Sequence, residues 1–198
     1  RDGGLGVLEG RTWDAVIDNS ATNPRWARDS AQLLKNSVNV YLFTSTRAVY
    51  AHFRQIGMDE TSAVHEVDES AVDEGRRLGY GPDKVLCERE VQRALPGRAL
   101  IVRPSLIAGP GDRSDRFTYW AARIDRGGEV LAPGDPGNPV MFLDVRDLAD
   151  FYVHLLEEGS VGVFNALGPD GSRRFDELLY GIKAVTSTKV SFTWVDTD

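Results

Sequence analysis

The stretch PDKVLCEREVQRALPGRALIVRPSLIAG, residues 82–109, joins a helical pattern to an apolar run. The pattern predicts a helix over 82–95, with Pro82 in its first turn and a Pro–Gly pair just beyond its end. The residues that follow are mostly apolar and predict a strand over 98–109. A helix that leads directly into a buried strand is one repeat of a fold in which strands and helices alternate.

The same alternation continues in both directions along the chain. On the N-terminal side it predicts a strand, a helix and a strand, at 13–21, 24–36 and 39–46. On the C-terminal side it predicts a strand, a helix, a strand, a helix and a strand, at 139–143, 145–158, 161–167, 173–186 and 190–195. Asn23 is a candidate cap of the first helix. We therefore expect an α/β fold with a largely parallel sheet.

Composition limits the classes of partner and the compartment. The chain has 198 residues, a formal net charge of −7 and one cysteine, Cys87. The acidic balance makes a nucleic-acid partner unlikely. One cysteine allows no internal disulfide, and we interpret it as a buried helix thiol, so we expect a cytoplasmic protein. No apolar run has membrane-spanning length, and the three histidines lack the spacing of a metal site.

The segment 54–79 interrupts the alternation. It is rich in acidic residues, namely Asp59, Glu60, Glu66, Asp68, Glu69, Asp73 and Glu74. We favour a solvated surface loop inserted between a strand and a helix, with a lid over a site as the alternative.

Tyr80 and Lys84 are spaced by four residues at the start of the predicted helix. On a helix, positions i and i+4 lie on one face, and a nearby ammonium stabilises a phenolate. A tyrosine in that setting can exchange a proton with a substrate hydroxyl or carbonyl. The alternative is a chance pair, since this spacing is common on helices.

Two further features lie at the ends of predicted strands. Thr44, Ser45 and Thr46 follow one strand, at the edge of a parallel sheet where ligands gather. These hydroxyls are candidates to polarise a substrate oxygen, or simply cap the strand end. A Gly–Pro–Gly turn at 109–111 follows another strand and either lets backbone approach a ligand or only reverses the chain.

Five motifs together resemble the extended short-chain dehydrogenase/reductase superfamily, in its NAD-dependent epimerase/dehydratase family. In order they are AVIDNSA, FTSTRAVY, YGPDK, VRPSLIAGPGD and FLDVRDLADF, and they span most of 13–158. The runs DRFTYW at 115–120 and VFNALGPDG at 163–171 are most similar to atypical bacterial members. Those members are in turn similar to chloroplast stem-loop RNA-binding proteins.

The resemblance implies a catalytic group. Tyr80 would be the general acid/base, and Lys84 would hold the nicotinamide ribose and favour the phenolate form of the tyrosine. Thr46 matches the catalytic Ser/Thr of the family, with Ser45 as the alternative. Arg113 and Arg116 would bind an anionic group of the substrate, unless they are simply solvated arginines.

The resemblance also implies the cofactor, NAD or NADP, and the residues that would contact it. These residues are Asn19, Ser20, Ala21, Lys84, Pro104, Ser105, Leu106 and Ile107. The implied fold is a Rossmann-like doubly wound parallel sheet. We expect residues 1–110 to form a partial dinucleotide-binding domain and 111–198 a mixed Rossmann and substrate-binding part.

The sequence departs from the family at its most diagnostic motif. The glycine-rich turn GxxGxxG, which holds the pyrophosphate at a helix N-terminus, is absent. About sixty residues of the usual layout, including those that choose between NAD and NADP, would precede the first predicted strand. That strand, 13–18, should then be an apolar sheet edge. We expect either a longer native chain or an edge covered by another chain, such as a second copy.

Two functions follow from these observations. The first is an NAD(P)-dependent epimerase, dehydratase or reductase that acts on a hydroxyl or carbonyl carbon, with a nucleotide sugar as one candidate substrate. The second is a non-catalytic relative that binds a nucleotide or RNA, since fold alone does not determine function.

Overall fold

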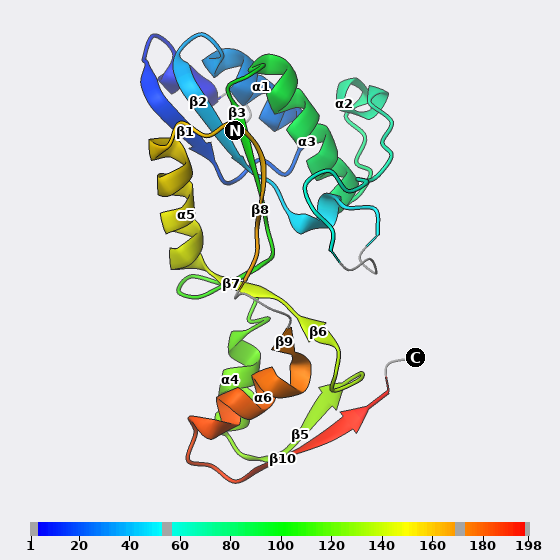
Figure 1. The fold of residues 1–198 in the computed structure, drawn as a ribbon. Coiled ribbons are helices and arrows are strands. Elements are labelled where there is room, and N and C mark those ends of the chain that lie inside the picture. Colours follow the sequence, from blue (N-terminus) through cyan, green and yellow to red (C-terminus); the bar gives the residue numbers. More distant parts are fainter. Residues whose placement is uncertain (1–3, 53–56, 169–172, 197–198) are drawn as a thin grey trace. The chain divides into compact units, whose positions relative to one another are not determined.

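The computed structural model describes residues 4–52, 57–168 and 173–196, and its chain divides into two compact units (Figure 1). Unit 1 comprises Arg1–Pro104 and Asp150–Ala166, and unit 2 comprises Ser105–Ala149 and Leu167–Asp198. Residues 54–56 of the acidic segment and 169–171 of the run VFNALGPDG lie outside the described residues. No described helix is both long and apolar enough to cross a membrane.

Unit 1 is built on a four-stranded parallel sheet. Its strands are β1 (Trp13–Asp18), β2 (Val38–Thr44), β3 (Ala99–Pro104) and β8 (Gly162–Ala166), in the order β1-β2-β3-β8. Every residue of β3 is buried, because a central parallel strand is covered on both faces. The predicted α/β fold with a parallel sheet is confirmed. β1 ends the strand order, and its Ile17 is 43% exposed, so the apolar strand forms a sheet edge within the described chain.

Helices cover both faces of this sheet (Figure 1). α1 (Pro24–Leu34) packs against α3 (Tyr80–Ala94) on one face, and Asn23 caps α1 by accepting a hydrogen bond from the Arg25 amide. The core between them includes Ala27, Ala31, Leu34, Tyr41, Phe43, Cys87, Val91 and Ile101. On the other face lies α5 (Val145–Glu157), whose residues from Asp150 onward belong to unit 1.

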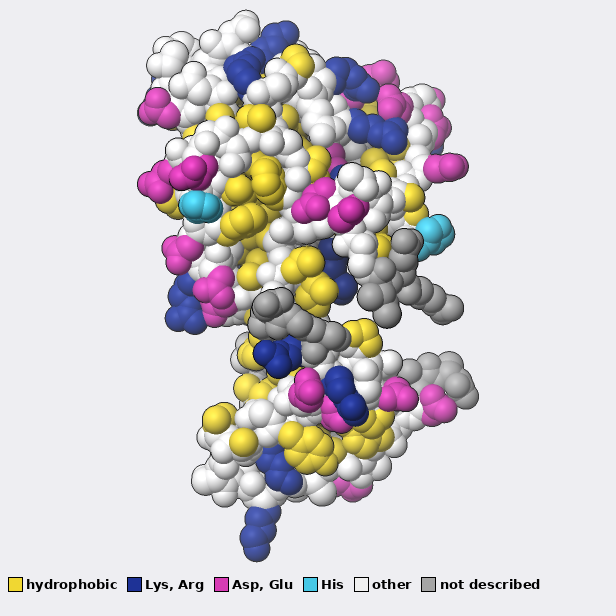
Figure 2. Space-filling view, viewed as in Figure 1, with side chains coloured by type: hydrophobic (Ala, Val, Ile, Leu, Met, Phe, Trp, Pro, Cys, Tyr) yellow, Lys and Arg dark blue, Asp and Glu magenta, His cyan; other side chains and the backbone are white. Residues whose placement is uncertain are grey.

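The described residues of the acidic segment are mostly exposed, as expected of a surface insertion, but the segment is not only a loop. It contains the short helix α2 (Ser70–Glu74), whose Ala71 and Val72 are buried against Leu86 of α3. Its carboxylates face arginines of the two long helices: Asp73 lies 2.6 Å from Arg28, and Glu69 lies 2.8 Å from Arg89 and 2.9 Å from Arg93. Figure 2 shows acidic and basic side chains interspersed over this region.

The described residues of unit 2 form three two-stranded pairings, two complete helices and the first residues of α5. β4 (Leu106–Ala108) is parallel to β7 (Phe142–Asp144), β5 (Gly128–Pro133) is parallel to β10 (Val190–Val195), and β6 (Pro139–Val140) is antiparallel to β9 (Arg173–Arg174). The helices are α4 (Thr118–Asp125) and α6 (Phe175–Ala184). Their core consists of Ile124, Val130, Ala132, Phe175, Leu179 and Val190.

Three predicted elements differ from the structure. The strand predicted over 139–143 was wrong, because it consists of two strands, β6 and β7, that pair with β9 and β4, respectively. The single strand over 98–109 was wrong, because β3 ends at Pro104 and β4 begins at Leu106 and pairs with β7 instead. Proline has no N–H to donate, so a ladder commonly ends there. The helix predicted over 173–186 begins at Phe175, since Arg173 and Arg174 form β9.

Candidate functional site

The three consecutive hydroxyl residues Thr44, Ser45 and Thr46, at the end of β2, have three different environments. Side chains alternate between the two faces of a strand, so Thr44 and Ser45 point to opposite faces. Thr44 Oγ1 lies 2.8 Å from the hydroxyl of Tyr152, on α5, and donates to Asn19 Oδ1 at 2.7 Å. Ser45 Oγ donates to the buried carboxylate of Glu88, on α3. The two helices therefore lie on opposite faces of β2.

Thr46 has the third of these environments. It is the cap of η2 (Arg47–Val49), and its Oγ1 accepts a hydrogen bond from the Ala48 amide at 3.2 Å. A hydroxyl that accepts from the backbone still has its own proton to donate. Thr44 and Ser45 donate their hydroxyl protons to the side chains of Asn19 and Glu88, whereas the contact of Thr46 with the Ala48 amide does not use its proton.

A tight turn follows β1 at the same edge of the sheet. Asp18 Oδ1 accepts from the amides of Ser20 and Ala21 at 3.0 and 3.1 Å, and its Oδ2 accepts from the hydroxyl of Tyr41 at 2.9 Å. Asn19 and Ser20 are exposed, whereas Ala21 is buried. The hydrogen bond from Thr44 occupies the amide oxygen of Asn19, which leaves the amide NH2 group as the donor end.

Tyr80 and Lys84 lie one turn apart on α3 and differ in exposure. Tyr80 is the first residue of the helix and is 55% exposed, whereas Lys84 is 3% exposed. The ammonium of Lys84 donates to the carbonyls of Ala21, at 2.9 Å, and Thr44, at 2.7 Å. It also lies 4.4 Å from the centre of the Phe43 ring. A buried cation thus joins α3 to the carboxyl ends of β1 and β2.

The start of α3 is held by a second set of polar contacts. Asp83 is fully buried, and its carboxylate accepts from the Leu78 amide at 2.9 Å and from Arg77 at 2.6 Å. Arg77 also donates to the carbonyl of Thr22, in the turn after β1, at 3.1 Å. Arg77 therefore connects the turn after β1 to the start of α3.

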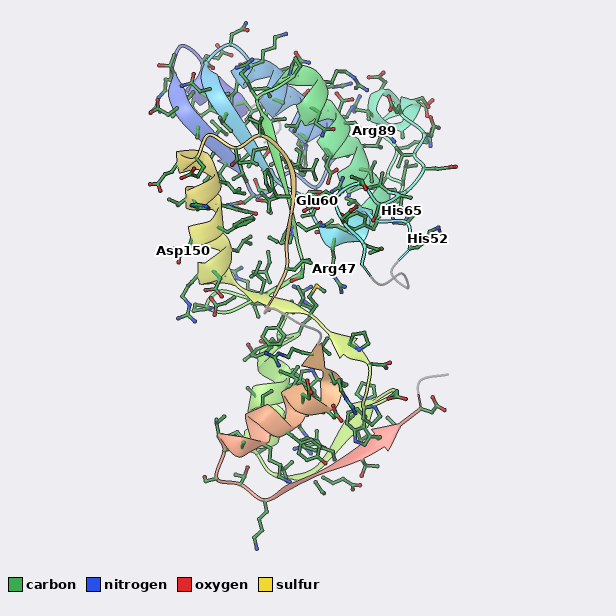
Figure 3. The ribbon with its side chains drawn as sticks, viewed as in Figure 1. Arg47, His52, Glu60, His65, Arg89 and Asp150 are labelled. Atoms are coloured by element: carbon green, nitrogen blue, oxygen red, sulfur yellow. The ribbon has the colours of Figure 1, made fainter. Side chains whose placement is uncertain are left out.

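Gly81 allows α3 to approach η2 closely. A methyl group at this position would lie 2.2 Å from the carbonyl oxygen of Ala48 and 3.0 Å from Nε2 of His65. Figure 3 shows His65 beside the start of this helix. The glycine between Tyr80 and Lys84 therefore fixes how near the helix that carries them comes to the residues that follow Thr46.

We expect Gly81→Ala to destabilise the protein by about 1–3 kcal/mol, because backbone must move to admit the methyl group. Gly181→Ala is the matched control, since that glycine lies within α6 and a methyl group there meets nothing within 4 Å. We expect the control to be neutral or to stabilise by about 0.4–1 kcal/mol. Urea denaturation measures both, and equal effects of the two substitutions would contradict this packing argument.

Several residues that the sequence analysis did not single out complete the site. Glu88 and Arg103 form a buried ion pair at 2.7 Å, and Arg103 also donates to the Tyr50 hydroxyl at 3.1 Å. Burial opposes the charge of Arg103, but the hydrogen bonds and charge of Glu88 outweigh it and raise the pKa of the guanidinium. Burial raises the pKa of Tyr152 to about 12, against the opposing effect of its hydrogen bond with Thr44.

Cys87 lies on α3 and is fully buried. Burial raises the pKa of its thiol to about 12, so the reactive thiolate is not populated near neutral pH. The interpretation of this cysteine as a buried helix thiol is confirmed.

The remaining candidates follow β3 along the chain. Pro104 is the last residue of β3, and Ser105, the first residue of unit 2, has a buried hydroxyl without a hydrogen-bond partner among the described residues. Leu106 and Ile107 belong to β4. Arg113 and Arg116 are exposed, and Arg116 donates to the hydroxyl of Ser114 at 2.7 Å.

Solved structures share this fold at low sequence identity. A dTDP-4-dehydrorhamnose reductase from Bacillus anthracis, solved in complex with NADP, is 18% identical with a TM-score of 0.69 and matches 93% of this chain. A UDP-N-acetylglucosamine 4-epimerase from Methanobrevibacter ruminantium, solved in complex with UDP-N-acetylmuramic acid, is 17% identical with a TM-score of 0.74 and matches 95%. A crystal structure from Burkholderia cenocepacia is 19% identical with a TM-score of 0.74 and matches 93%.

This chain covers 66%, 65% and 63% of those three chains, respectively, which is less than two thirds of each. The comparison with curated proteins found no match. The sequence profile of the NAD dependent epimerase/dehydratase family matches residues 23–166, a range that includes the hydroxyl residues after β2, all of α3 and the strands β2, β3 and β8. The expected Rossmann-like fold and an NAD or NADP cofactor agree with this match. The chain belongs to the NAD-dependent epimerase/dehydratase family.

Proposed function

We propose that this protein is an NAD(P)-dependent oxidoreductase or epimerase that acts on a carbon bearing a hydroxyl or carbonyl group. The observation that carries the proposal is the buried ammonium of Lys84 at the carboxyl ends of β1 and β2, one helical turn from the exposed Tyr80. Ligands of parallel α/β sheets bind outside the carboxyl ends of the strands. A cation and a phenol at that edge are suited to proton transfer.

The residues present fit the nicotinamide end of a dinucleotide. Lys84 is proposed to face the ribose, and the exposed turn residues Asn19 and Ser20, with Ala21, are proposed to line its path. The donor end of the Asn19 amide suits the acceptor oxygens of a dinucleotide. We propose that Pro104, Ser105, Leu106 and Ile107 also contact the cofactor. The buried hydroxyl of Ser105 has no hydrogen-bond partner among the described residues. No glycine-rich phosphate turn occurs in the sequence printed here.

When bound, the nicotinamide supplies or accepts a hydride. Tyr80 is proposed to handle the accompanying proton: its phenolate accepts the proton of the substrate hydroxyl during oxidation and becomes the phenol, and the phenol returns that proton to the substrate oxygen during reduction. Lys84 supplies a positive charge one turn further along the same helix. Exposure of Tyr80 keeps its hydroxyl within reach of a substrate.

We propose Thr46 rather than Ser45 as the donor to the substrate oxygen. The proton of Ser45 is directed to Glu88, whereas Thr46 accepts from the Ala48 amide and retains a proton to donate. A nucleotide sugar is the proposed substrate class, because structures with this fold include a UDP-sugar epimerase and a dTDP-sugar reductase. Arg113 and Arg116 are exposed cations suited to its phosphate groups.

The proposal is tested by titrating the protein with NADH and NADPH while nicotinamide fluorescence and melting temperature are followed. We expect saturable binding of at least one cofactor and a rise in melting temperature, because a ligand that binds only the native state stabilises it. No binding at millimolar cofactor would contradict the proposal. UDP-N-acetylglucosamine and dTDP-4-dehydrorhamnose are the first substrates to assay.

We expect Thr46→Val to lower kcat by about 10²–10³-fold, because one donor to the developing oxyanion is lost. Cofactor affinity should not change. Thr193→Val is the control, since Thr193 lies on β10 in unit 2, bonded to Glu129. An unchanged kcat for Thr46→Val, or a larger fall for Ser45→Ala than for Thr46→Val at unchanged stability, would contradict the choice of Thr46 as the donor.

A further inference from the structure

Five polar side chains from five segments of unit 1, four of them buried and one half-buried, form one hydrogen-bond network, which we call the Glu88–Arg103 network. Its members are Ser45, Tyr50, Glu88, Arg103 and Asn165. Arg103 donates to both oxygens of Glu88, at 3.0 and 2.7 Å, and the two side chains are only 6% and 5% exposed. A bidentate pair of this kind fixes the angle of both groups as well as their distance.

The direction of every hydrogen bond in this network is determined. Arg103 can only donate, so the Tyr50 hydroxyl, 3.1 Å away, must accept from it. The Tyr50 hydroxyl then donates to Asn165 Oδ1 at 2.7 Å. Ser45 can only donate to the ionised carboxylate of Glu88. Each member has one arrangement of protons, so the network defines one geometry.

The network holds both ends of the segment that contains Thr46. Ser45 precedes Thr46 directly, and Tyr50 follows η2 directly. The guanidinium of Arg103 also lies 4.9 Å from the centre of the Tyr50 ring. Between these two anchors, the amides of Val49 and Tyr50 bond back to Thr46 and Arg47. The position of Thr46 is therefore set by side chains on each side of it in the sequence.

The same network reaches the helix of the proposed acid/base. Glu88 lies on α3, four residues beyond Lys84 and eight beyond Tyr80. It reaches the acidic segment as well, because the Glu60 carbonyl accepts from Arg103 at 3.3 Å and the Glu60 carboxylate accepts from the Asn165 amide at 2.7 Å. Figure 3 shows Glu60 between this segment and β8.

Stability alone is a poor reason for such an arrangement. Removing two charges from water costs about as much as their attraction returns, so an apolar pair of similar volume would be equally stable or more so. What an apolar pair cannot supply is a fixed direction. We propose that the Glu88–Arg103 network is a positioning device that sets Thr46 relative to Tyr80 and Lys84; this inference rests on the proposed function.

Ser45→Ala and Tyr50→Phe test the proposal, because each removes one hydroxyl that is bonded to the ion pair and leaves Glu88 and Arg103 in place. We expect kcat to fall about ten- to hundredfold in both, with the KM for substrate and the affinity for NADPH unchanged. Ser45→Thr, which restores the hydroxyl, should recover most of kcat. The controls are Ser37→Ala, whose hydroxyl donates to the Leu34 carbonyl, and Tyr180→Phe, on the exposed side of α6. Wild-type kcat in both test variants would overturn the proposal, as would a rise in KM without a fall in kcat.

Hydrogen exchange gives a readout that needs no substrate. In Ser45→Ala and Tyr50→Phe, the amides of residues 46–50 should exchange about tenfold faster, while those of α1 and β10 do not change. If the wild-type protein turns over neither nucleotide sugar, the proposed function fails on its own. The exchange result then decides the network separately: faster exchange confined to 46–50 supports it, and unchanged exchange overturns it.

Discussion

Tyr80→Phe is expected to lower kcat by about 10²–10⁴-fold, which is the contribution of a positioned general acid/base. The substitution removes one oxygen from a side chain that is 55% exposed at the first position of α3. Because that side chain is largely exposed to solvent, loss of its hydroxyl should not alter stability. The cofactor site proposed around Lys84 and the turn after β1 stays intact. NADPH affinity should therefore match that of the wild type.

Tyr119→Phe is the matched control for this measurement. Tyr119 is 51% exposed, lies on α4 in unit 2, and has no role in the proposed chemistry. Steady-state kinetics of both variants, with fluorescence titration of NADPH, separates proton transfer from binding. Wild-type turnover in Tyr80→Phe would remove the mechanism. A large loss of NADPH affinity would instead assign the tyrosine to cofactor binding.

The fold could be predicted well where local patterns determine it. Helix and strand periods, caps and turn residues lie within a few positions of one another, which is why the parallel sheet and the helices α1, α3 and α5 were predicted correctly. The single strand over 98–109 was wrong because both halves are apolar, and only the choice of partner strand separates β3 from β4. Pairing partners are not encoded locally.

The acidic segment shows that ion-pair partners, like strand partners, are not encoded locally. Its carboxylates resemble those of a solvated loop, but Asp73 pairs with Arg28, 45 positions away, and Glu69 pairs with Arg89 and Arg93, 20 and 24 positions away. A charge can be interpreted as paired only when the fold has brought its partner near. Helix propensity over five residues is also too weak a signal to predict α2.

The position of the candidate site could be predicted from the sequence, but the separate roles of its hydroxyl residues could not. The run Thr44–Ser45–Thr46 marked the end of β2, yet the partners of Thr44 lie 25 and 108 positions away and the partner of Ser45 lies 43 positions away. One signal for the buried ion pair was present at Arg103, which interrupts the apolar run LIVRPSLIA, whereas Glu88 begins the charged stretch ERE. A charged residue is almost never fully buried unless it is paired, so the sequence indicates that Arg103 has a partner but does not identify Glu88.

Glu88→Ala is expected to destabilise the protein by about 3–5 kcal/mol, because it leaves Arg103 buried without its counter-charge. Ser45 loses the acceptor of its proton at the same time. Glu69→Ala is the matched control: this carboxylate also pairs with arginines, but it is 51% exposed, so its loss should cost only about 0–1 kcal/mol. Urea denaturation of the three proteins measures the difference.

A double substitution separates stability from positioning. In Glu88→Leu/Arg103→Met neither charge of the pair remains to be buried, and continuum arguments predict that most of the lost stability returns. The hydroxyls of Ser45 and Tyr50 then have no ionic partner to orient them, so kcat should stay low although the protein is folded. Recovery of both stability and kcat would mean that the ion pair only fills space. Recovery of stability without kcat is the result that a positioning device requires, since packing can replace the volume of the pair but not the direction of its hydrogen bonds.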